Sequence, residues 1–274
     1  MIVHLIDGTY ELFRHFYGLR RFHKTDPPFG AVSGVLNMVA KMIEDGATHI
    51  GVATDHIIES FRNDLWPGYK TGAGIERALR AQFHPLEDAL TAMGVAVWAM
   101  VEFEADDALA AAAHLAAKDK RVEKVCIWTP DKDLAQCVVD DRVVQIDRRK
   151  NEIRDEAAVK AKFGVAPVFI ADYLALVGDA ADGYPGIKGL GAKTAASLLN
   201  RYGHIEQFPS EILTEANRDL ALLFKNLATL RTDIPLFKRV NELRWDGPTE
   251  SFAGVAKKIG DARIESRARK LQNR

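Results

Sequence analysis

Four short apolar runs in the first half of the chain are each followed within a few residues by acidic side chains, and this pattern limits the possible folds more than any other feature. The runs cover residues 2–6, 49–54, 95–100 and 124–129, and a fifth covers residues 142–146. Segments with helical spacing of apolar residues separate most of them. Short strands that alternate with helices predict an α/β fold with a central, mainly parallel sheet flanked by helices.

The acids that follow these strands should gather at one edge of the sheet, because the carboxyl ends of parallel strands lie together. They are Asp7, Asp55, Glu104, Asp106, Asp107, Asp131 and Asp133. A single Asp at such a junction is more often a helix N-cap than a ligand. Seven acids from four junctions exceed what capping requires, and they would repel each other without a cation. Carboxylate oxygens are the ligands that Mg²⁺ or Mn²⁺ prefers, so we predict a metal site.

From about residue 155 the sequence changes to helices joined by glycine-rich turns. Asp179 and Asp182 follow a predicted helix at residues 172–177, and a glycine turn at residues 186–191 opens the next helix. No strand precedes this turn, which disfavours a dinucleotide-binding fingerprint. A turn of this kind between two helices lets backbone N–H groups approach a DNA phosphate, with Lys188 and Lys193 beside it.

The charge balance suits a polyanionic partner. The chain of 274 residues has 37 Lys and Arg against 38 Asp and Glu, a net charge of −1. Setting aside the nine acids named above leaves 29 acids and a balance of +8 for the rest, which favours nucleic acid as the partner. The basic tail at residues 255–274 is equally well interpreted as a solvated helix face or as a DNA contact.

Two further segments are predicted to be irregular. Residues 60–74 alternate aromatic and basic side chains ahead of several glycines, which is typical either of an ordinary surface loop or of a mobile loop that stacks on bases and grips phosphates. Residues 23–30 contain two prolines and are predicted to form a loop. Helical character returns over residues 75–93, with a break or a helix start near Pro85.

Cysteine usage and hydropathy indicate a cytoplasmic protein. Cys126 and Cys137 both lie in apolar segments and read as reduced core residues. No apolar run reaches the ~18 residues of a membrane span, and Asp7 interrupts the first apolar run too early for a signal peptide. We therefore expect no membrane association.

These motifs together resemble the 5′-nuclease family, which comprises the flap endonucleases and the 5′-to-3′ exonuclease domain of bacterial DNA polymerase I. The resemblance covers about residues 1–240, in the family's order and spacing. The matching motifs are Asp7-Gly8, Ser60-Phe61-Arg62, Tyr69-Lys70, Glu104-Ala105-Asp106-Asp107, Thr129-Pro130-Asp131-Lys132-Asp133-Leu134, Gly178-Asp179-x-x-Asp182, Gly186-Ile187-Lys188-Gly189-Leu190-Gly191-x-Lys193-Thr194 and Arg231-Thr232-Asp233-x-Pro235-Leu236.

The resemblance implies a PIN-like or resolvase-like nuclease core and a helical DNA-binding element called a helix-three-turn-helix. We expect the core at residues 1–160, with an arch region at residues 60–84. The helical subdomain is expected at residues 161–240 and a basic C-terminal segment at residues 241–274.

The resemblance also implies two divalent metal ions and a potassium ion. Asp7, Asp55, Glu104 and Asp106 would hold one divalent ion, and Asp131, Asp133, Asp179 and Asp182 the other. Asp131 would lie near both ions, and Asp107 is counted with the metal residues in a supporting place. Potassium would bind at the glycine turn near residues 188–191.

By the same resemblance, Lys70 and Asp131 are the expected catalytic residues, with Lys70 neutralising the scissile phosphate. Expected DNA contacts are Arg14, Arg62, Tyr69, Lys70, Arg77, Lys188, Gly189, Gly191, Lys193 and Thr194. The chain departs from the family at two positions. Ala73 stands where the arch usually has an Arg, so that Arg77 or Arg80 replaces it or phosphate clamping is weakened, and Gly183 stands where the family has Asn.

The expected function is a stand-alone, monomeric, nucleoid-associated 5′ nuclease that acts on 5′ flaps, branched or nicked duplexes and 5′ ends of DNA. Three alternatives stay open. A PIN-type ribonuclease shares the acidic sheet edge but lacks the glycine turn. A phosphatase is suggested by Asp7-Gly8-Thr9 but leaves Asp179 and Asp182 without a role. A DNA-junction binder that has lost cleavage is supported only by Ala73.

Overall fold

The fold is built on one six-stranded sheet with the strand order β3-β2-β1-β4-β5-β6. The structure, a computed structural model, describes residues 1–20 and 28–272. β1 to β5 run parallel, and β6 pairs antiparallel with β5. The strands are β1 (Ile2–Asp7), β2 (His49–Asp55), β3 (Ala96–Met100), β4 (Lys124–Trp128), β5 (Val143–Asp147) and β6 (Glu152–Arg154). The predicted α/β fold with a mainly parallel sheet is confirmed.

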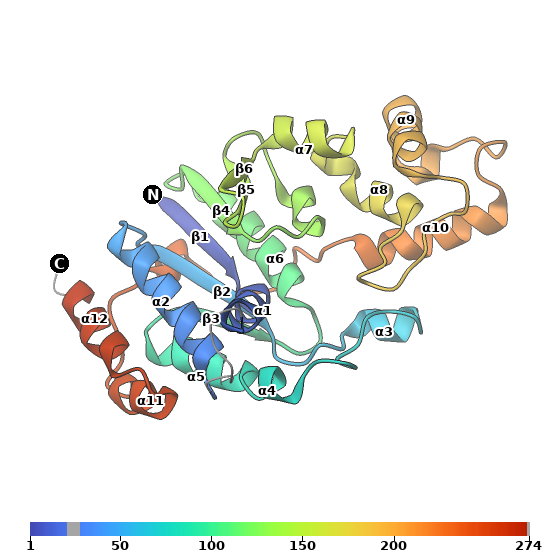
Figure 1. The fold of residues 1–274 in the computed structure, drawn as a ribbon. Coiled ribbons are helices and arrows are strands. Elements are labelled where there is room, and N and C mark those ends of the chain that lie inside the picture. Colours follow the sequence, from blue (N-terminus) through green and yellow to red (C-terminus); the bar gives the residue numbers. More distant parts are fainter. Residues whose placement is uncertain (21–27, 273–274) are drawn as a thin grey trace.

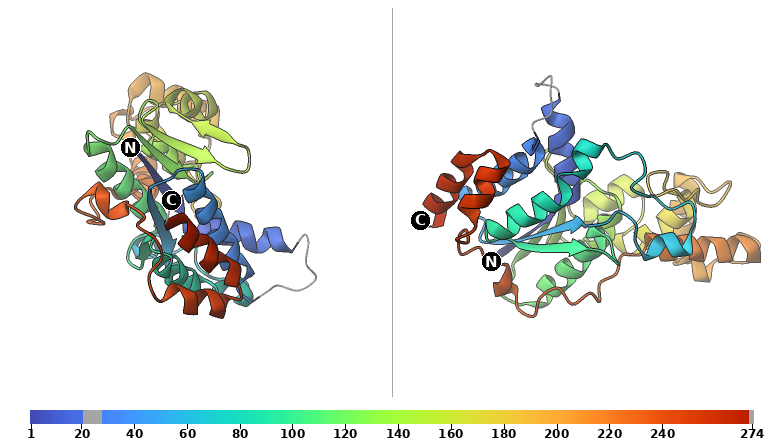
Figure 2. Two further views of the ribbon diagram at one scale, coloured as in Figure 1. Left: turned by 90° about the vertical axis from the view of Figure 1, so that its left-hand side faces the viewer. Right: turned by 90° about the horizontal axis from the view of Figure 1, so that it is seen from below.

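Helices cover both faces of the sheet (Figure 1). One face carries α1 (Gly8–Leu19), α2 (Gly30–Glu44), α5 (Phe83–Ala92), α11 (Phe252–Ile259) and α12 (Ala262–Gln272). The other carries α6 (Ala105–Lys118) and the segment around the 3₁₀ helix η4 (Val240–Leu243). Each layer of helices has its own hydrophobic core, because successive side chains of a strand point to opposite faces of the sheet. In β1, Ile6 faces α1 and α2, whereas Val3 and Leu5 face α6. The right-hand view of Figure 2 shows the sheet between these two layers.

A helical subdomain with its own core lies beyond the carboxyl ends of the strands, on the right of Figure 1. Its helices are α7 (Glu156–Phe163), α8 (Ile170–Val177), α9 (Ala192–Tyr202) and α10 (Glu215–Ala228), with 3₁₀ helices η2 (Pro167–Phe169) and η3 (Ile205–Gln207) between them. α8 packs on both α9 and α10. Tyr69 contributes to this core, so the segment before the acidic edge is anchored on the subdomain.

The expected loop at residues 60–74 contains a helix, α3 (Phe61–Leu65). Ser60 caps it and forms a capping box with Asn63. The expected helix at residues 75–93 is divided into α4 (Arg77–Arg80) and α5, and Pro85 lies in the first turn of α5, where its missing N–H has no intrahelical partner to lose. β6 was not predicted, because three residues carry too short a pattern to recognise. Residues 23–27 of the predicted proline-containing loop lie outside the described residues.

The C-terminal segment is divided at Gly260, a residue with φ of 83°, into α11 and α12. Ile264, Ala268 and Leu271 are buried in the core on the α2 face, so one side of α12 is a packing surface and only its other side is solvated. In Figure 1 these helices lie at the opposite end of the molecule from α9 and α10. Among the helices in the described residues, none combines the length and the apolar character that a membrane crossing requires.

Candidate metal site and nucleic-acid interface

Asp7 and Asp55 end two neighbouring central strands. Asp7 caps α1 by accepting the N–H of Tyr10 at 2.8 Å, and its other oxygen accepts the Thr129 hydroxyl at 3.0 Å. Asp55 accepts the N–H of Ala105 at 2.9 Å, which brings it to the start of α6. Burial raises the pKa of Asp7 to about 7, and the negative charges of Asp55 and Asp131 add to this effect.

Glu104 is surrounded by hydrogen-bond donors from the segment before it in the chain. Its carboxylate accepts the Ser60 hydroxyl at 2.7 Å and the Lys70 Nζ at 2.8 Å. The Arg62 Nη1 donates at 3.3 Å and the Tyr69 hydroxyl at 3.4 Å. Burial alone would raise the pKa of Glu104, but Lys70 and Arg62 outweigh burial and lower it. Glu104 is therefore ionised without a metal ion.

Asp133, Asp179 and Asp182 form a second cluster, with carboxylate oxygens that all lie within 4.8 Å of one another. All three residues are buried. Lys132 pairs with Asp179 at 2.6 Å and Lys70 pairs with Asp182 at 3.0 Å, whereas the buried Oδ1 of Asp133 has no hydrogen-bond partner. Burial and the negative charges of Asp131, Asp182 and Asp179 raise the pKa of Asp133 well above its ordinary value. A buried, unpartnered carboxylate oxygen among other acids fits a divalent cation.

Asp106 and Asp131 connect this Asp133 cluster with the Glu104 cluster, which consists of Asp7, Asp55 and Glu104. Burial raises the pKa of Asp106 well above its ordinary value, and the nearest negative charges that add to this effect are Asp131 and Asp7. Asp131 is exposed, and its Oδ1 accepts the N–H of Asp133 at 3.0 Å. The structure thus brings eight of the nine predicted acids to the carboxyl edge of the sheet, and three of them, Asp133, Asp179 and Asp182, have carboxylate oxygens close enough to share one cation.

Asp107 is the exception, and its contacts fit the supporting place expected for it rather than direct metal binding. Its side chain is 0% exposed and both oxygens are fully used. One accepts the Arg62 Nη2 at 2.7 Å and the N–H of Arg231 at 2.9 Å. The other accepts the Arg62 Nη1 at 2.6 Å and the N–H of Glu104 at 3.0 Å. With four hydrogen bonds it has no lone pair left for a metal ion.

Two of the residues predicted to contact DNA, Arg62 and Tyr69, have buried side chains. Arg62 is 1% exposed and gives its donors to protein groups. Tyr69 is 4% exposed, and its ring packs in the core of the helical subdomain, so no nucleotide can stack on it in this arrangement. The motif located both residues correctly beside Glu104 but could not show that they face inward.

Lys70 bridges the two clusters, with its Nζ between Glu104 and Asp182. Burial alone would lower its pKa, but these carboxylates raise it well above its ordinary value, so Lys70 stays charged. Its position is set by backbone pairing, because the N–H of Lys70 donates to the carbonyl of Asp182 at 3.0 Å. The Trp66 indole donates to the carbonyl of Gly183 at 3.0 Å.

This pairing explains why Gly183 stands where the resemblance leads one to expect Asn. Gly183 has φ of 84°, and a Cβ built on it would lie 1.9 Å from the carbonyl oxygen of Gly68. Any side chain there would force apart the two backbone segments that place Lys70 and Asp182. Gly183 is therefore explained by the close approach of its backbone to that of Gly68.

The glycine turn is held from inside and open to solvent outside. Ile187 is buried and its N–H donates to the carbonyl of Leu176 at 2.8 Å. The predicted contact residues Lys188, Gly189, Gly191, Lys193 and Thr194 are all exposed. Gly191 is the N-cap of α9 and no side chain caps this helix. Its first N–H groups are therefore free to receive an anion such as a phosphate.

The remaining predicted DNA contacts lie elsewhere on the surface. Arg14 pairs with the buried Glu11 at 2.5 Å. Arg77 is exposed on α4, as is Arg80, both of them after the exposed Ala73. Three residues of the matching motifs that had been given no role also hold the acids. Thr129 donates to Asp7, Ser60 to Glu104 and Lys132 to Asp179. The capping box could have indicated a role for Ser60. Thr129 and Lys132 had no signal beyond their place in the motif at residues 129–134.

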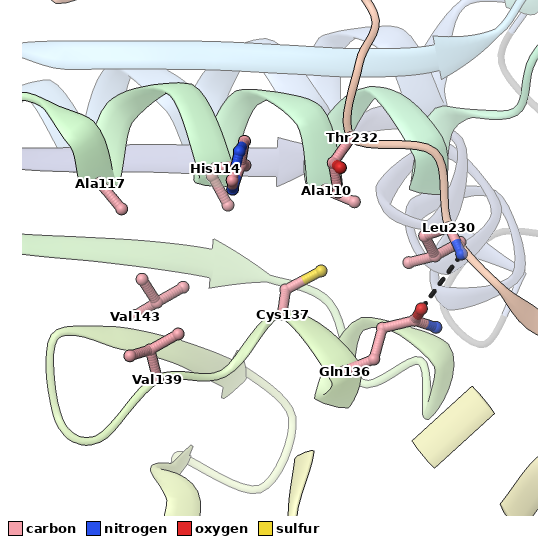
Figure 3. Close-up of a pocket in the computed structure, with 10 residues that line it drawn as sticks. Ala110, His114, Ala117, Gln136, Cys137, Val139, Val143, Leu230 and Thr232 are labelled. Atoms are coloured by element: carbon pink, nitrogen blue, oxygen red, sulfur yellow. Dashed lines mark hydrogen bonds between the residues drawn. The ribbon is translucent and has the colours of Figure 1, made fainter. Parts of the chain in front are cut away.

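A cavity of about 200 Å³ lies apart from the acidic edge, between α6, the 3₁₀ helix η1 (Asp133–Cys137), β5 and residues 230–232 (Figure 3). Ala110, Ala113 and Val143 give it a mainly apolar wall. None of the nine acids lines it. Figure 3 shows the Gln136 side chain bonded to the backbone of Leu230 at one end of this cavity.

Comparisons with known proteins agree with this arrangement. The model of the 5′-3′ exonuclease N-terminal resolvase-like domain matches residues 2–164, and that of the 5′-3′ exonuclease C-terminal SAM fold matches residues 165–251. A 5′-3′ exonuclease of Buchnera aphidicola is 34% identical over 84% of this chain and 82% of its own length. DNA polymerase I of Rhizobium leguminosarum is 36% identical over 85% of this chain, which spans only 25% of that protein.

Solved structures show the same fold. The T5 D15 protein, co-crystallised with metal ions, aligns over 100% of this chain and 99% of its own with a TM-score of 0.68 and 18% identity. The catalytic core of Rad2 in complex with a DNA substrate aligns over 99% of this chain and 92% of its own with a TM-score of 0.58 and 13% identity. The two family models match in order and together cover most of the sequence, so the chain belongs to the 5′-3′ exonuclease family.

Proposed function

We propose that this protein is a structure-specific 5′ nuclease that hydrolyses DNA phosphodiester bonds with two divalent metal ions. The observation that carries the proposal is the unpartnered Oδ1 of Asp133, buried among acids at the carboxyl edge of the sheet. Bound there, divalent ions would supply an activated water and stabilise the leaving oxygen. The all-carboxylate donor set favours Mg²⁺, with Mn²⁺ as the alternative.

The ligands divide between the two clusters. Asp7, Asp55, Glu104 and Asp106 would hold one ion, and Asp131, Asp133, Asp179 and Asp182 the other. Asp131 is the residue that faces both groups, since its charge acts on Asp7, Asp106 and Asp133. This position supports a direct part for Asp131 in catalysis.

Lys70 is the residue of this chain that we assign to the scissile phosphate. Its side chain is 33% exposed, and its Nζ contacts one carboxylate from each cluster at the acidic edge. A fixed cation at this point offsets the repulsion between the carboxylates and an incoming phosphate. It also stabilises the additional negative charge that develops during hydrolysis.

The duplex would be held by the glycine turn and the start of α9. Exposed Lys188, Lys193 and Thr194 flank uncapped N–H groups, which is the arrangement expected for a phosphate contact. A potassium ion near residues 188–191 is part of the proposal. The T5 D15 flap endonuclease and the Rad2 core were crystallised with DNA, which supports DNA as the partner. We infer a monomer that acts on 5′ flaps, nicked or branched duplexes and 5′ ends in the bacterial cytoplasm, near the nucleoid.

One competing function has an observation in its favour. Ala73 is exposed where the family usually has an Arg, and a weakened clamp would leave a protein that binds DNA junctions and cuts them poorly. The exposed Arg77 and Arg80 on α4 supply two guanidinium groups a short distance along the chain, which favours retained cleavage.

The decisive experiment compares cleavage of a 5′-flap duplex, a nicked duplex, single-stranded DNA and RNA, each with Mg²⁺, with Mn²⁺ and with a chelator. We expect metal-dependent cutting of the DNA duplexes near the 5′ end. Cutting that persists in chelator, or a preference for RNA, would overturn the proposal. Tight binding of the flap without cutting in either metal would instead establish the junction binder.

A further inference from the structure

We propose that Arg62 and Gln136 are positioning residues that fix the two carboxylate clusters to one segment of backbone, residues 227–231. This segment leads from the end of α10 in the helical subdomain back to the sheet core. The inference rests on the proposed function only in taking the carboxylates as metal ligands. It adds a role for two residues that are not themselves proposed metal ligands.

Arg62 connects the segment to the Glu104 cluster. Its Nε donates to the carbonyl of Leu227 at 2.7 Å, and its Nη2 donates to the carbonyl of Thr229 at 3.3 Å. The rest of the guanidinium binds both oxygens of Asp107 and one oxygen of Glu104. A guanidinium has five donors in a fixed plane, and here it joins α3, the start of α6 and the end of α10.

Asp107 completes this connection from the other side. It accepts the N–H of Arg231, the next donor along the segment, and the N–H of Glu104 itself. The backbone of Glu104 is thus tied to the same carboxylate that orients Arg62. Because Arg62 and Asp107 are 1% and 0% exposed, these bonds are protected from water and hold their geometry.

Gln136 connects the segment to the Asp133 cluster. Its Nε2 donates to the carbonyl of Ala228 at 3.0 Å, and its Oε1 accepts the N–H of Leu230 at 3.1 Å (Figure 3). Its Nε2 also donates to the carbonyl of Asp133 at 2.9 Å. The amide therefore links residues 228 and 230 directly to the backbone of Asp133, the acid whose Oδ1 has no partner.

The two links alternate along one stretch of chain. Arg62 and Asp107 form hydrogen bonds with the backbone of residues 227, 229 and 231, and Gln136 does so with residues 228 and 230. Leu227 and Ala228 end α10 and Thr229 follows in an extended conformation, so the last turn of the helix and the chain after it present backbone groups to both clusters. The distance between the clusters is then set by the segment, and ligand geometry depends on both links.

The test measures metal binding to the full-length protein without DNA, by calorimetric titration with Mn²⁺ for the wild type, Arg62→Lys and Gln136→Met. Lys keeps the charge but cannot make the planar set of bonds, and Met keeps the length of Gln without its amide. We expect Mn²⁺ affinity to fall at least about tenfold in Arg62→Lys and at least about threefold in Gln136→Met, in line with the loss typical of groups that orient metal ligands.

Arg142→Lys is the matched control. Its guanidinium also donates to backbone carbonyls, those of Ala117, Asp119 and Val122, but at the amino-terminal ends of the strands. We expect this variant to lose thermal stability while its Mn²⁺ affinity stays within twofold of the wild type. Flap binding in chelator should stay within twofold for all three variants.

Wild-type Mn²⁺ affinity in both Arg62→Lys and Gln136→Met would overturn the inference, whatever their melting temperatures. A fall of equal size in Arg142→Lys would also overturn it, because general destabilisation would then explain the result. If Arg62→Lys does not fold, Gln136→Met decides. Absence of DNA cleavage by the wild type would contradict the proposed nuclease, whereas the Mn²⁺ titrations would still test the positioning role.

Discussion

The Glu104 cluster and the Asp133 cluster are built from the same kind of side chain at the same edge of one sheet, yet they differ in how their charge is balanced. Glu104 has Lys70, Arg62 and Ser60 as partners, and its pKa is lowered. Asp133 faces other acids, one of its oxygens has no partner, and its pKa is raised. Protein cations therefore balance the charge of Glu104 itself, whereas the unpartnered oxygen of Asp133 fits the added cation that we propose.

The largest expected effect is on hydrolysis, and here the two clusters should behave alike. Asp133→Asn and Glu104→Gln should each lower kcat on a 5′-flap duplex by at least about 10³-fold, because a neutral amide is a weaker ligand for a hard divalent ion. Flap binding in chelator should change little, which an electrophoretic mobility shift would measure. Near-normal cleavage by Asp133→Asn would mean that this cluster does not hold a catalytic ion.

Lys70 belongs to both clusters, so its removal should weaken catalysis next in size. Lys70→Met should lower kcat about 10²-fold or more, since it removes a cation positioned for the scissile phosphate. Single-turnover cleavage at saturating protein separates this effect from DNA binding. Lys132→Met removes the other ammonium in the acidic group, on Asp179. A larger loss in that control than in Lys70→Met would contradict the assignment of Lys70.

In the metal-free protein, substitutions in the two clusters should change the free energy of unfolding in opposite directions. Asp133→Asn should raise the free energy of unfolding by roughly 1 kcal/mol, because it removes a buried charge that repels its neighbours. Glu104→Gln should lower it by roughly 2 kcal/mol, because Arg62 and Lys70 lose a buried partner. Urea denaturation in chelator measures both values. If the two variants shift in the same direction, the contrast between the clusters is wrong.

The smallest effect is the pH dependence of metal-free stability. Asp7 has a folded-state pKa of about 7, above the ordinary unfolded value of about 3.9, so the folded protein binds more protons between these values. Its contribution to stability is therefore present at low pH and declines as the pH rises from about 4 to about 7. The raised pKa values of Asp106 and Asp133 act in the same direction.

We expect the melting temperature in chelator to fall by several degrees between pH 5.5 and pH 7.5, and 10 mM Mg²⁺ to remove most of that fall, because the ion replaces the bound protons. Glu104 acts in the opposite direction only at lower pH, since its lowered pKa contributes stability that is lost as the pH falls below about 4. Scanning fluorimetry at both pH values measures the balance. A melting temperature in chelator that rises over this range would contradict the raised pKa values of Asp7, Asp106 and Asp133, because the lowered pKa of Glu104 lies below this range.

Sequence reasoning located the acidic edge because it depended on local patterns and on one rule of topology. Apolar runs marked the strands, and parallel order brought their ends together. Motif spacing predicted that Arg62, Tyr69 and Asp107 lie beside the site, but it did not predict that their side chains are buried. Burial of Arg62 depends on the carbonyl of Leu227, a contact across 165 residues of sequence that no local pattern records. The roles of the acids as ligands and of the exposed turn as a DNA contact stay predictions.

The central position of β1 has a consequence for how the protein folds during its synthesis on the ribosome. β1 pairs with β2 and with β4, and β4 begins at residue 124, more than a hundred residues after β1 ends. Asp182 and residues 227–231 follow later still. A growing chain therefore exposes Asp7 and Asp55 long before the rest of the acidic edge exists. Such non-local pairing slows folding, and a partly made chain on the ribosome would lack the means to cut the nucleic acid around it.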